Sequence, residues 1–75
     1  MEVFAVDDDG VRRTAHLHGD GLYKCYPRSN NLVADARCFS DLRDAAAFLV
    51  LNPDWGIRMQ PGSAIIYESI QINRR

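Results

Sequence analysis

Residues 40–53 read SDLRDAAAFLVLNP, and this stretch predicts the helix around which the rest of the chain folds. Ser40 is a good N-cap, and Asp41 and Asp44 place negative charge in the first turn, where the helix dipole favours it. Asn52, which stands before a proline, ends the helix. The apolar spacing of i, i+3, i+4 and i+7 predicts one face that covers a sheet, formed by Leu42, Ala45, Ala46 and Leu49.

Four β-favouring runs precede the helix, and turn-forming residues separate them. The runs cover residues 2–6, 11–18, 22–26 and 32–39. Asp7-Asp8-Asp9-Gly10 predicts a first hairpin, and Gly19-Asp20-Gly21 predicts a second one. A five-residue connection over 27–31 leads to the fourth run. We therefore expect a four-stranded meander before the helix.

Two further strands are expected after the helix, over residues 55–59 and 64–72. Pro61-Gly62 between them suits a type II turn, which splays the flanking strands and disfavours a tight hairpin. A chain of 75 residues allows one domain, over residues 1–75. The sequence thus predicts an α+β domain with an antiparallel sheet, in the order β-β-β-β-α-β-β, and a single helix packed on one face.

Side-chain alternation along the first four runs divides them into two faces. The predicted core face comprises Phe4, Val6, Val11, Arg13, Ala15, Leu17, Leu22, Lys24, Tyr26, Leu32, Ala34, Ala36 and Cys38. The predicted outer face comprises Val3, Ala5, Arg12, Thr14, His16, His18, Tyr23, Cys25, Val33, Asp35, Arg37 and Phe39. Because Cys25 and Cys38 fall on opposite faces, no disulfide is expected between them.

Composition excludes several classes of protein. The chain is 47% hydrophobic and 25% charged, as in ordinary globular domains, and its net charge of -1 gives no global field for nucleic acid or an anionic membrane. No apolar run reaches the roughly 18 residues that span a bilayer. The first seven residues carry neither a basic leader nor an apolar core, so no secretory signal is expected. With two cysteines in all, we expect reduced thiols and a cytoplasmic location.

His16-Leu17-His18-Gly19-Asp20 is the one run whose residue types suit a metal. It is similar to the His-x-His-x-Asp run of the metallo-β-lactamase family, in which a second histidine directly follows the aspartate. Gly21 stands at that place here, and the chain is too short for that fold. A histidine pair with Cys25 across the hairpin suits adventitious Zn²⁺ or Ni²⁺, but a solvated polar face is the favoured interpretation. No cofactor or metal is predicted.

Catalysis is not predicted either. The residue types of a nucleophilic site are present in Cys25, His16 or His18, and Asp35, but nothing in their spacing fixes a geometry. Glycine-rich phosphate loops are absent from the sequence. We therefore expect a protein that acts by contact.

The outer face suggests one alternative function, which is binding of single-stranded nucleic acid. Sheet surfaces that bind single strands combine aromatic stacking with arginine contacts to phosphate. Asp35 on the same face and the net negative charge of the chain count against this reading. The residues that would bind are Arg12, His16, His18, Tyr23 and Arg37.

Protein association is the function that the sequence favours. One thin core does not readily cover all the apolar surface of this chain. That surface includes apolar residues beyond the helix stripe, a tryptophan after the helix and an isoleucine-rich last strand. We expect a small protein-binding or regulatory module, a homodimer whose long last strand could pair with its symmetry mate at a sheet edge. The alternative is that these residues are internal core. The expected association surface comprises Phe48, Val50, Leu51, Trp55 and Ile72.

Overall fold

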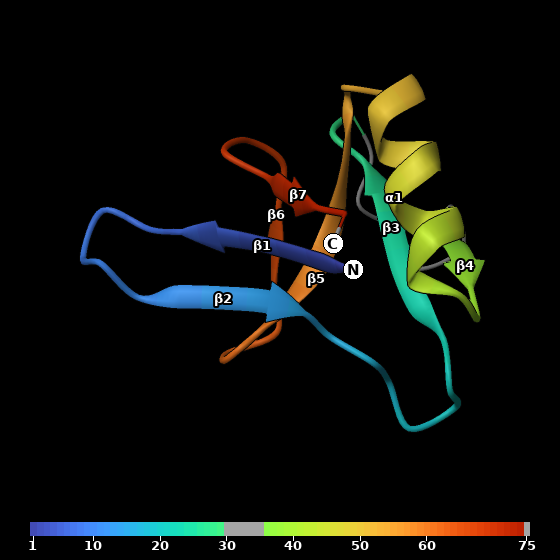
Figure 1. Ribbon diagram of the computed structural model, residues 1–75, viewed down its shortest axis with the longest axis horizontal. Helices are drawn as coiled ribbons and strands as arrows, with labels where there is room; N and C mark the ends of the chain where they lie inside the picture. The colour runs from blue at the N-terminus through green and yellow to red at the C-terminus, as the bar shows by residue number, and fades with distance from the viewer. Residues whose placement is uncertain (30–35, 75) are drawn as a thin grey trace.

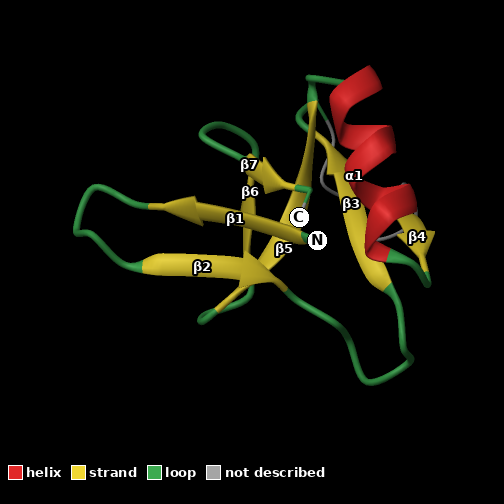
Figure 2. Ribbon diagram, viewed as in Figure 1, coloured by secondary structure: helices red, strands yellow, loops and turns green. Residues whose placement is uncertain are grey.

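The computed structural model describes residues 1–29 and 36–74, and their strands form one antiparallel sheet with a helix packed against it (Figures 1 and 2). This confirms the predicted α+β class with a single helix. The predicted outer and core positions over residues 32–35 lie outside the described residues. The elements are β1 (Glu2–Val6), β2 (Arg12–Ala15), β3 (Tyr23–Pro27), β4 (Arg37–Phe39), α1 (Leu42–Leu51), β5 (Trp55–Gln60), β6 (Ala64–Ile66) and β7 (Gln71–Asn73).

The strand order differs from the predicted meander. The sheet runs β4-β3-β5-β2-β1-β7, and β6 pairs with β5 beside this path. Although a tight turn joins β2 and β3, each of them pairs with β5, through Ala15↔Met59 and Cys25↔Ile57. The meander was wrong because β5 places two fully buried side chains, Ile57 and Met59, along the middle of the sheet. Pairing both strands with it places Ala15 and Cys25 beside these buried side chains, and burial of apolar area favours this order.

The turn between β1 and β2 contains a bulge residue, which shifts the pairing of the two strands by one residue from the predicted register. Gly10 has a φ of 80°, its amide donates to the Asp7 carbonyl at 2.9 Å, and the Asp7 amide donates to the Val11 carbonyl at 3.0 Å. This is a turn followed by a bulge residue in the left-handed region, which glycine adopts without steric cost. The register therefore pairs Ala5 with Arg13 and not Phe4 with Arg13.

The predicted core and outer faces of β1 and β3 are exchanged relative to β2. The Gly10 bulge causes the exchange in β1, and the turn before β3 has the same arrangement, with Gly21 at a φ of 80°. Val3, Ala5 and Cys25 are buried against the helix, whereas Val6 is 45% exposed on the opposite face. Tyr26 is buried as expected, but on the face opposite Cys25, with the Arg58 guanidinium 5.1 Å from its ring centre. Val11 and Leu17, also predicted core residues, are exposed. The core cluster comprises Val3, Ala5, Cys25, Ala45, Ala46, Leu49, Ile57 and Met59.

The last predicted strand, over residues 64–72, is two strands in the structure. β6 ends at Ile66, the chain passes through Ser69 with a φ of 64°, and β7 pairs with β1 through Val3↔Ile72. The expected long edge strand is therefore absent from the described residues. The chain ends meet in the same part of the sheet, where Glu2 pairs with Asn73 (Figure 1).

A tight hairpin joins β5 and β6, which corrects the expectation of splayed strands. Met59 pairs with Ala64, and Arg58 pairs with Ile65. The reversal is possible because Gly62 and Ser63 adopt consecutive φ angles of 88° and 56°. A type II turn has only one such residue, so it does not describe this connection.

Helix α1 follows the prediction closely, with a shift of one residue at its start. Asp41 is the N-cap in place of Ser40, because its Oδ1 accepts from the Arg43 amide at 2.9 Å. Asn52 ends the helix as expected. The predicted stripe faces the sheet, with Ala45, Ala46 and Leu49 buried and Leu42 partly buried. The helix contacts β1, β3 and β4.

The two cysteines are free and differ sharply in accessibility. Cys25 is fully buried, and this burial raises the pKa of its thiol to about 12, whereas Cys38 is exposed. Because the thiolate is the reactive form, we expect iodoacetamide at pH 8 to modify one thiol of the folded protein and both thiols in denaturant. Mass spectrometry counts the added groups. Equal modification of both cysteines without denaturant, or a mass change on reduction, would contradict this assignment.

Candidate functional site

The end of helix α1 carries the most exposed large apolar side chains of the described residues. Leu51 is 79% exposed and Val50 is 55% exposed. The helix stops directly after them, because the Asn52 amide donates to the Leu49 carbonyl at 3.3 Å and the Asn52 side-chain Nδ2 donates to the Phe48 carbonyl at 2.8 Å. This cap fixes the last turn with both apolar side chains directed away from the core.

A shallow apolar groove of about 240 Å³ lies beside these side chains. One wall comes from the helix end and the residues that follow it, and the other comes from the segment between β6 and β7 together with β7. Three of the five residues predicted for association therefore line one groove. The lining comprises Leu49, Val50, Pro53, Trp55, Tyr67, Ser69, Ile70 and Ile72.

Phe48, another predicted association residue, belongs to an aromatic cluster inside the domain. Its ring centre lies 5.3 Å from that of Phe39 and 4.9 Å from that of Trp55, the latter in an edge-to-face arrangement. Such aromatic pairs contribute about 0.5–1.5 kcal/mol beyond the area they bury. Arg37 lies over the Phe48 ring at 5.6 Å. Phe48 thus contacts the groove through Trp55, which belongs to both the cluster and the groove.

Tyr67 and Ile70 line the groove but were not among the predicted site residues. The sequence offers a weak signal for them, because the apolar residues of 64–72 fall on both sides of a single extended strand. A break in that strand, at Ser69, allows Tyr67 and Ile70 to face the groove together. The Tyr67 hydroxyl donates to the Pro27 carbonyl at 3.4 Å, which anchors this wall to β3.

An ion pair lies beside Tyr67, outside the lining of the groove. Arg28 pairs with Glu68 at 3.0 Å, and its guanidinium lies 5.2 Å from the centre of the Tyr67 ring. Both charged side chains are at least half exposed, so the pair contributes about 0–1 kcal/mol to stability.

The five residues predicted for nucleic-acid binding do not form one surface. Arg12 makes a two-pronged ion pair with Glu2, at 2.9 and 2.6 Å, which lowers the pKa of Glu2. Tyr23 packs against the core on the helix side of the sheet, and Arg37 lies over Phe48. The predicted grouping depended on the meander and on the predicted division of the two faces, and the structure has neither in the described residues.

His16 and His18 remain together on the turn that follows β2. The His16 Nδ1 lies 3.0 Å from the Gln60 Oε1, and the two imidazole ring centres are 4.5 Å apart. Cys25 is buried in the core and does not join them. Within residues 1–29 and 36–74, no group of three or more histidine, cysteine, aspartate or glutamate side chains is arranged to hold a metal ion.

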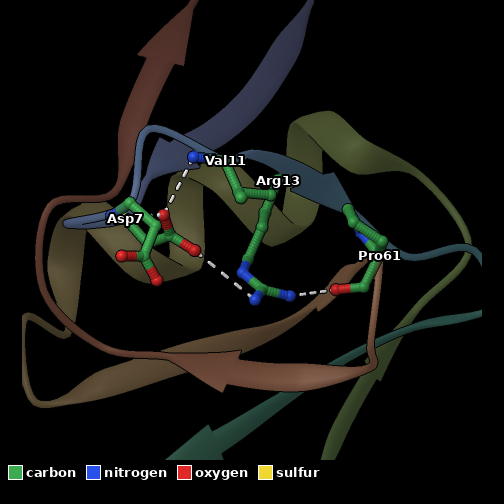
Figure 3. Close-up of polar contacts among 5 residues, drawn as sticks. Asp7, Val11, Arg13 and Pro61 are labelled. Carbon is green, nitrogen blue, oxygen red and sulfur yellow. Dashed lines mark hydrogen bonds and ion pairs between the residues drawn. The ribbon is translucent and has the colours of Figure 1, made fainter.

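Arg13 links the β1–β2 turn to the β5–β6 turn. Figure 3 shows its guanidinium reaching between the Asp7 carboxylate, at 3.5 Å, and the Pro61 carbonyl. The other Asp7 carboxylate oxygen accepts from the Val11 amide at 2.9 Å (Figure 3). A hollow of about 200 Å³ adjoins these residues. Because the guanidinium is already engaged on both sides, we assign Arg13 a structural role.

The fold and the groove define a small α+β domain with an antiparallel sheet and an apolar concave surface at the end of its helix. Comparison of the chain with protein-family models, curated proteins and solved structures finds no match. None of the described helices is long and apolar enough to cross a membrane.

Proposed function

We propose that this protein is a small protein-binding or regulatory module that acts as a homodimer, without catalysis, through the groove and the helix end beside it. The observation that carries the proposal is the pairing of a protrusion with a hollow of the same chemistry. Val50 and Leu51 project from the helix end, and the groove next to them is lined mostly by apolar side chains. We call these residues together the groove surface.

A surface on which a protruding side chain lies beside a groove suits a partner that carries the same surface. In a two-fold dimer the same patch is used on both subunits, so the Leu51 side chain of each protomer would enter the groove of the other. Complete burial of a leucine side chain contributes about 1.5–3 kcal/mol. Trp55 and Tyr67, the aromatic residues of the groove, belong to residue types that dominate binding energy at interfaces.

The size of the domain supports self-association. Stable interfaces bury about 800 Å² per partner, which is about a sixth of the 4763 Å² surface of the described residues. A chain of this length hides only roughly 60–65% of the surface that its unfolded form exposes, so its own core is thin. Covering the groove surface in a dimer would add apolar burial that the monomer lacks.

Substitution of Leu51 by aspartate tests the proposal. We expect L51D to keep the fold and to lose the dimer, because it places a charge at the centre of the interface but on the surface of the monomer. Light scattering over a dilution series measures the mass, and circular dichroism measures the fold. The matched control is L17D, which puts the same charge at another exposed leucine, away from the groove, and should leave the dimer intact.

One further variant and one added ligand extend this experiment. F48D should unfold the domain, because Phe48 packs between Phe39 and Trp55. A short single-stranded oligonucleotide added to the dilution series tests the alternative function, since phosphate contacts give strongly salt-dependent binding. A wild-type protein that is monomeric at every concentration, or an L51D variant that still dimerises, would overturn the proposal.

A further inference from the structure

The turn over residues 16–22 joins β2 to β3 and is held by three backbone hydrogen bonds. The His16 amide donates to the Arg58 carbonyl of β5 at 3.0 Å, which fixes the start of the turn to the middle of the sheet. The His18 amide donates to the Leu22 carbonyl at 3.1 Å, and the Gly21 amide donates to the His18 carbonyl at 2.9 Å. These last two bonds close the turn on itself and report on whether it is formed.

Two imidazoles pack at the base of this turn. Their ring centres are 4.5 Å apart, with the planes inclined at 71°, and His16 is held in place by Gln60 of β5. The Nε2 atom of His18 is enclosed and has no hydrogen-bond partner among the described residues. A neutral imidazole tolerates this position, because its second nitrogen needs no acceptor. A protonated imidazole has an N–H at both nitrogens, and one of them would be buried without an acceptor.

We propose that the 16–22 turn is a pH-responsive element, closed while His18 is neutral and opened when His18 binds a proton. Opening would let solvent reach Nε2 and would break the hydrogen bonds from the His18 and Gly21 amides. This element is independent of the groove surface, which is built from α1, Trp55 and residues 67–72.

The charges around His18 reinforce this response. Burial lowers the pKa of His18, and the neighbouring His16, Lys24 and Arg58 lower it further. Asp20 opposes them, but its two carboxylate oxygens already accept from the Lys24 ammonium, at 3.0 Å, and from the Leu22 amide, at 3.1 Å. Cationic groups on β3 and β5 therefore disfavour the charged form of His18, and the one carboxylate of the turn is engaged.

The direction of the effect follows from linkage. Opened His18 has the ordinary histidine pKa of about 6.5, and the closed turn holds it lower. The closed form is therefore fully favoured above pH 6.5 and loses stability as the pH falls toward the lowered value. One linked proton changes the opening equilibrium by at most about tenfold for each pH unit in this window.

Amide hydrogen exchange of the full chain, followed by NMR from pH 7.5 to pH 5, tests the proposal. After correction for the intrinsic pH dependence of exchange, we expect the protection of His18 and Gly21 to fall by up to about tenfold per pH unit below 6.5. Amides in the centre of β3 should keep their protection. Unchanged protection of His18 and Gly21 down to pH 5 would overturn the proposal.

Two glutamine variants identify the responsible group. H18Q removes the titrating ring, so its turn should stay protected at pH 5. H16Q removes a neighbouring imidazole that lowers the pKa of His18, so its turn should still open, with a midpoint at higher pH. If H18Q opened with the wild-type midpoint, some other group would control the turn and the proposal would fail. The wild-type exchange profile decides the question by itself if either variant does not fold.

Discussion

Replacing Ile57 with alanine is expected to lower the free energy of unfolding by about 2–5 kcal/mol. Ile57 is fully buried in the centre of β5, where it pairs with Cys25 of β3 on one side and Ile66 of β6 on the other. A cavity at this point removes contacts from two neighbouring strands, and the rigid sheet has little freedom to close it. A domain of this length has a total stability of only about 4–11 kcal/mol.

Thermal unfolding followed by circular dichroism measures this effect. For domains of this size each kcal/mol shifts the Tm by about 4–8 °C. The matched control is L17A, which also shortens a branched aliphatic side chain, at a site that is 51% exposed; its stability should change by less than about 0.5 kcal/mol. Similar Tm values for the I57A and L17A variants would show that Ile57 is not in the core.

The second large effect is expected from Gly56→Ala, also in β5. An added Cβ would lie 2.3 Å from the Ile66 carbonyl oxygen and 2.7 Å from the Tyr67 Cδ1. Because the closest atom belongs to the backbone of a paired strand, a side-chain rotation cannot relieve the clash. Overpacking of this kind costs about 1–3 kcal/mol or more, against the smaller intrinsic gain of replacing glycine in a strand.

Chemical denaturation of G56A and of its control G19A measures the difference. Gly19 has open space around an added Cβ and lies outside the left-handed region, so G19A should be neutral or stabilising by up to about 1 kcal/mol. We also expect G56A to perturb Tyr67, which lies over Gly56 and lines the groove. Equal stability of the two variants would mean that β6 does not approach β5 as closely as described.

Local signals predicted the helix and the places where most strands lie, because their causes are local. A capping aspartate, an apolar stripe and Asn52 before a proline fix α1 within one residue. The faces of the sheet were not predictable in the same way. They depend on one bulge residue in each of two turns, Gly10 and Gly21, and a shift of one residue exchanges the two sides of a strand.

The strand order failed for a different reason. Pairing of β2 and β3 with β5 joins residues about 30 to 45 positions apart, and no neighbouring residue signals such a choice. Whether the residues of each candidate site lie together depends on the same strand pairing. Val50, Trp55 and Ile72 come from a short stretch around the helix end and from the last strand, and they share one groove. The polar set from β2, β3 and β4 required the wrong pairing and is dispersed.

The β1–β2 turn has a consequence for how the gene can vary. Surface loops usually accept insertions and deletions freely, and Asp8, Asp9 and Gly10 are exposed. Here loop length and turn type together set which residues of β2 oppose β1, and Val3 and Ala5 belong to the core in this register. A homologous chain can change the identities of Asp8 and Asp9, but gaining or losing a single residue would require a different turn type to keep the register.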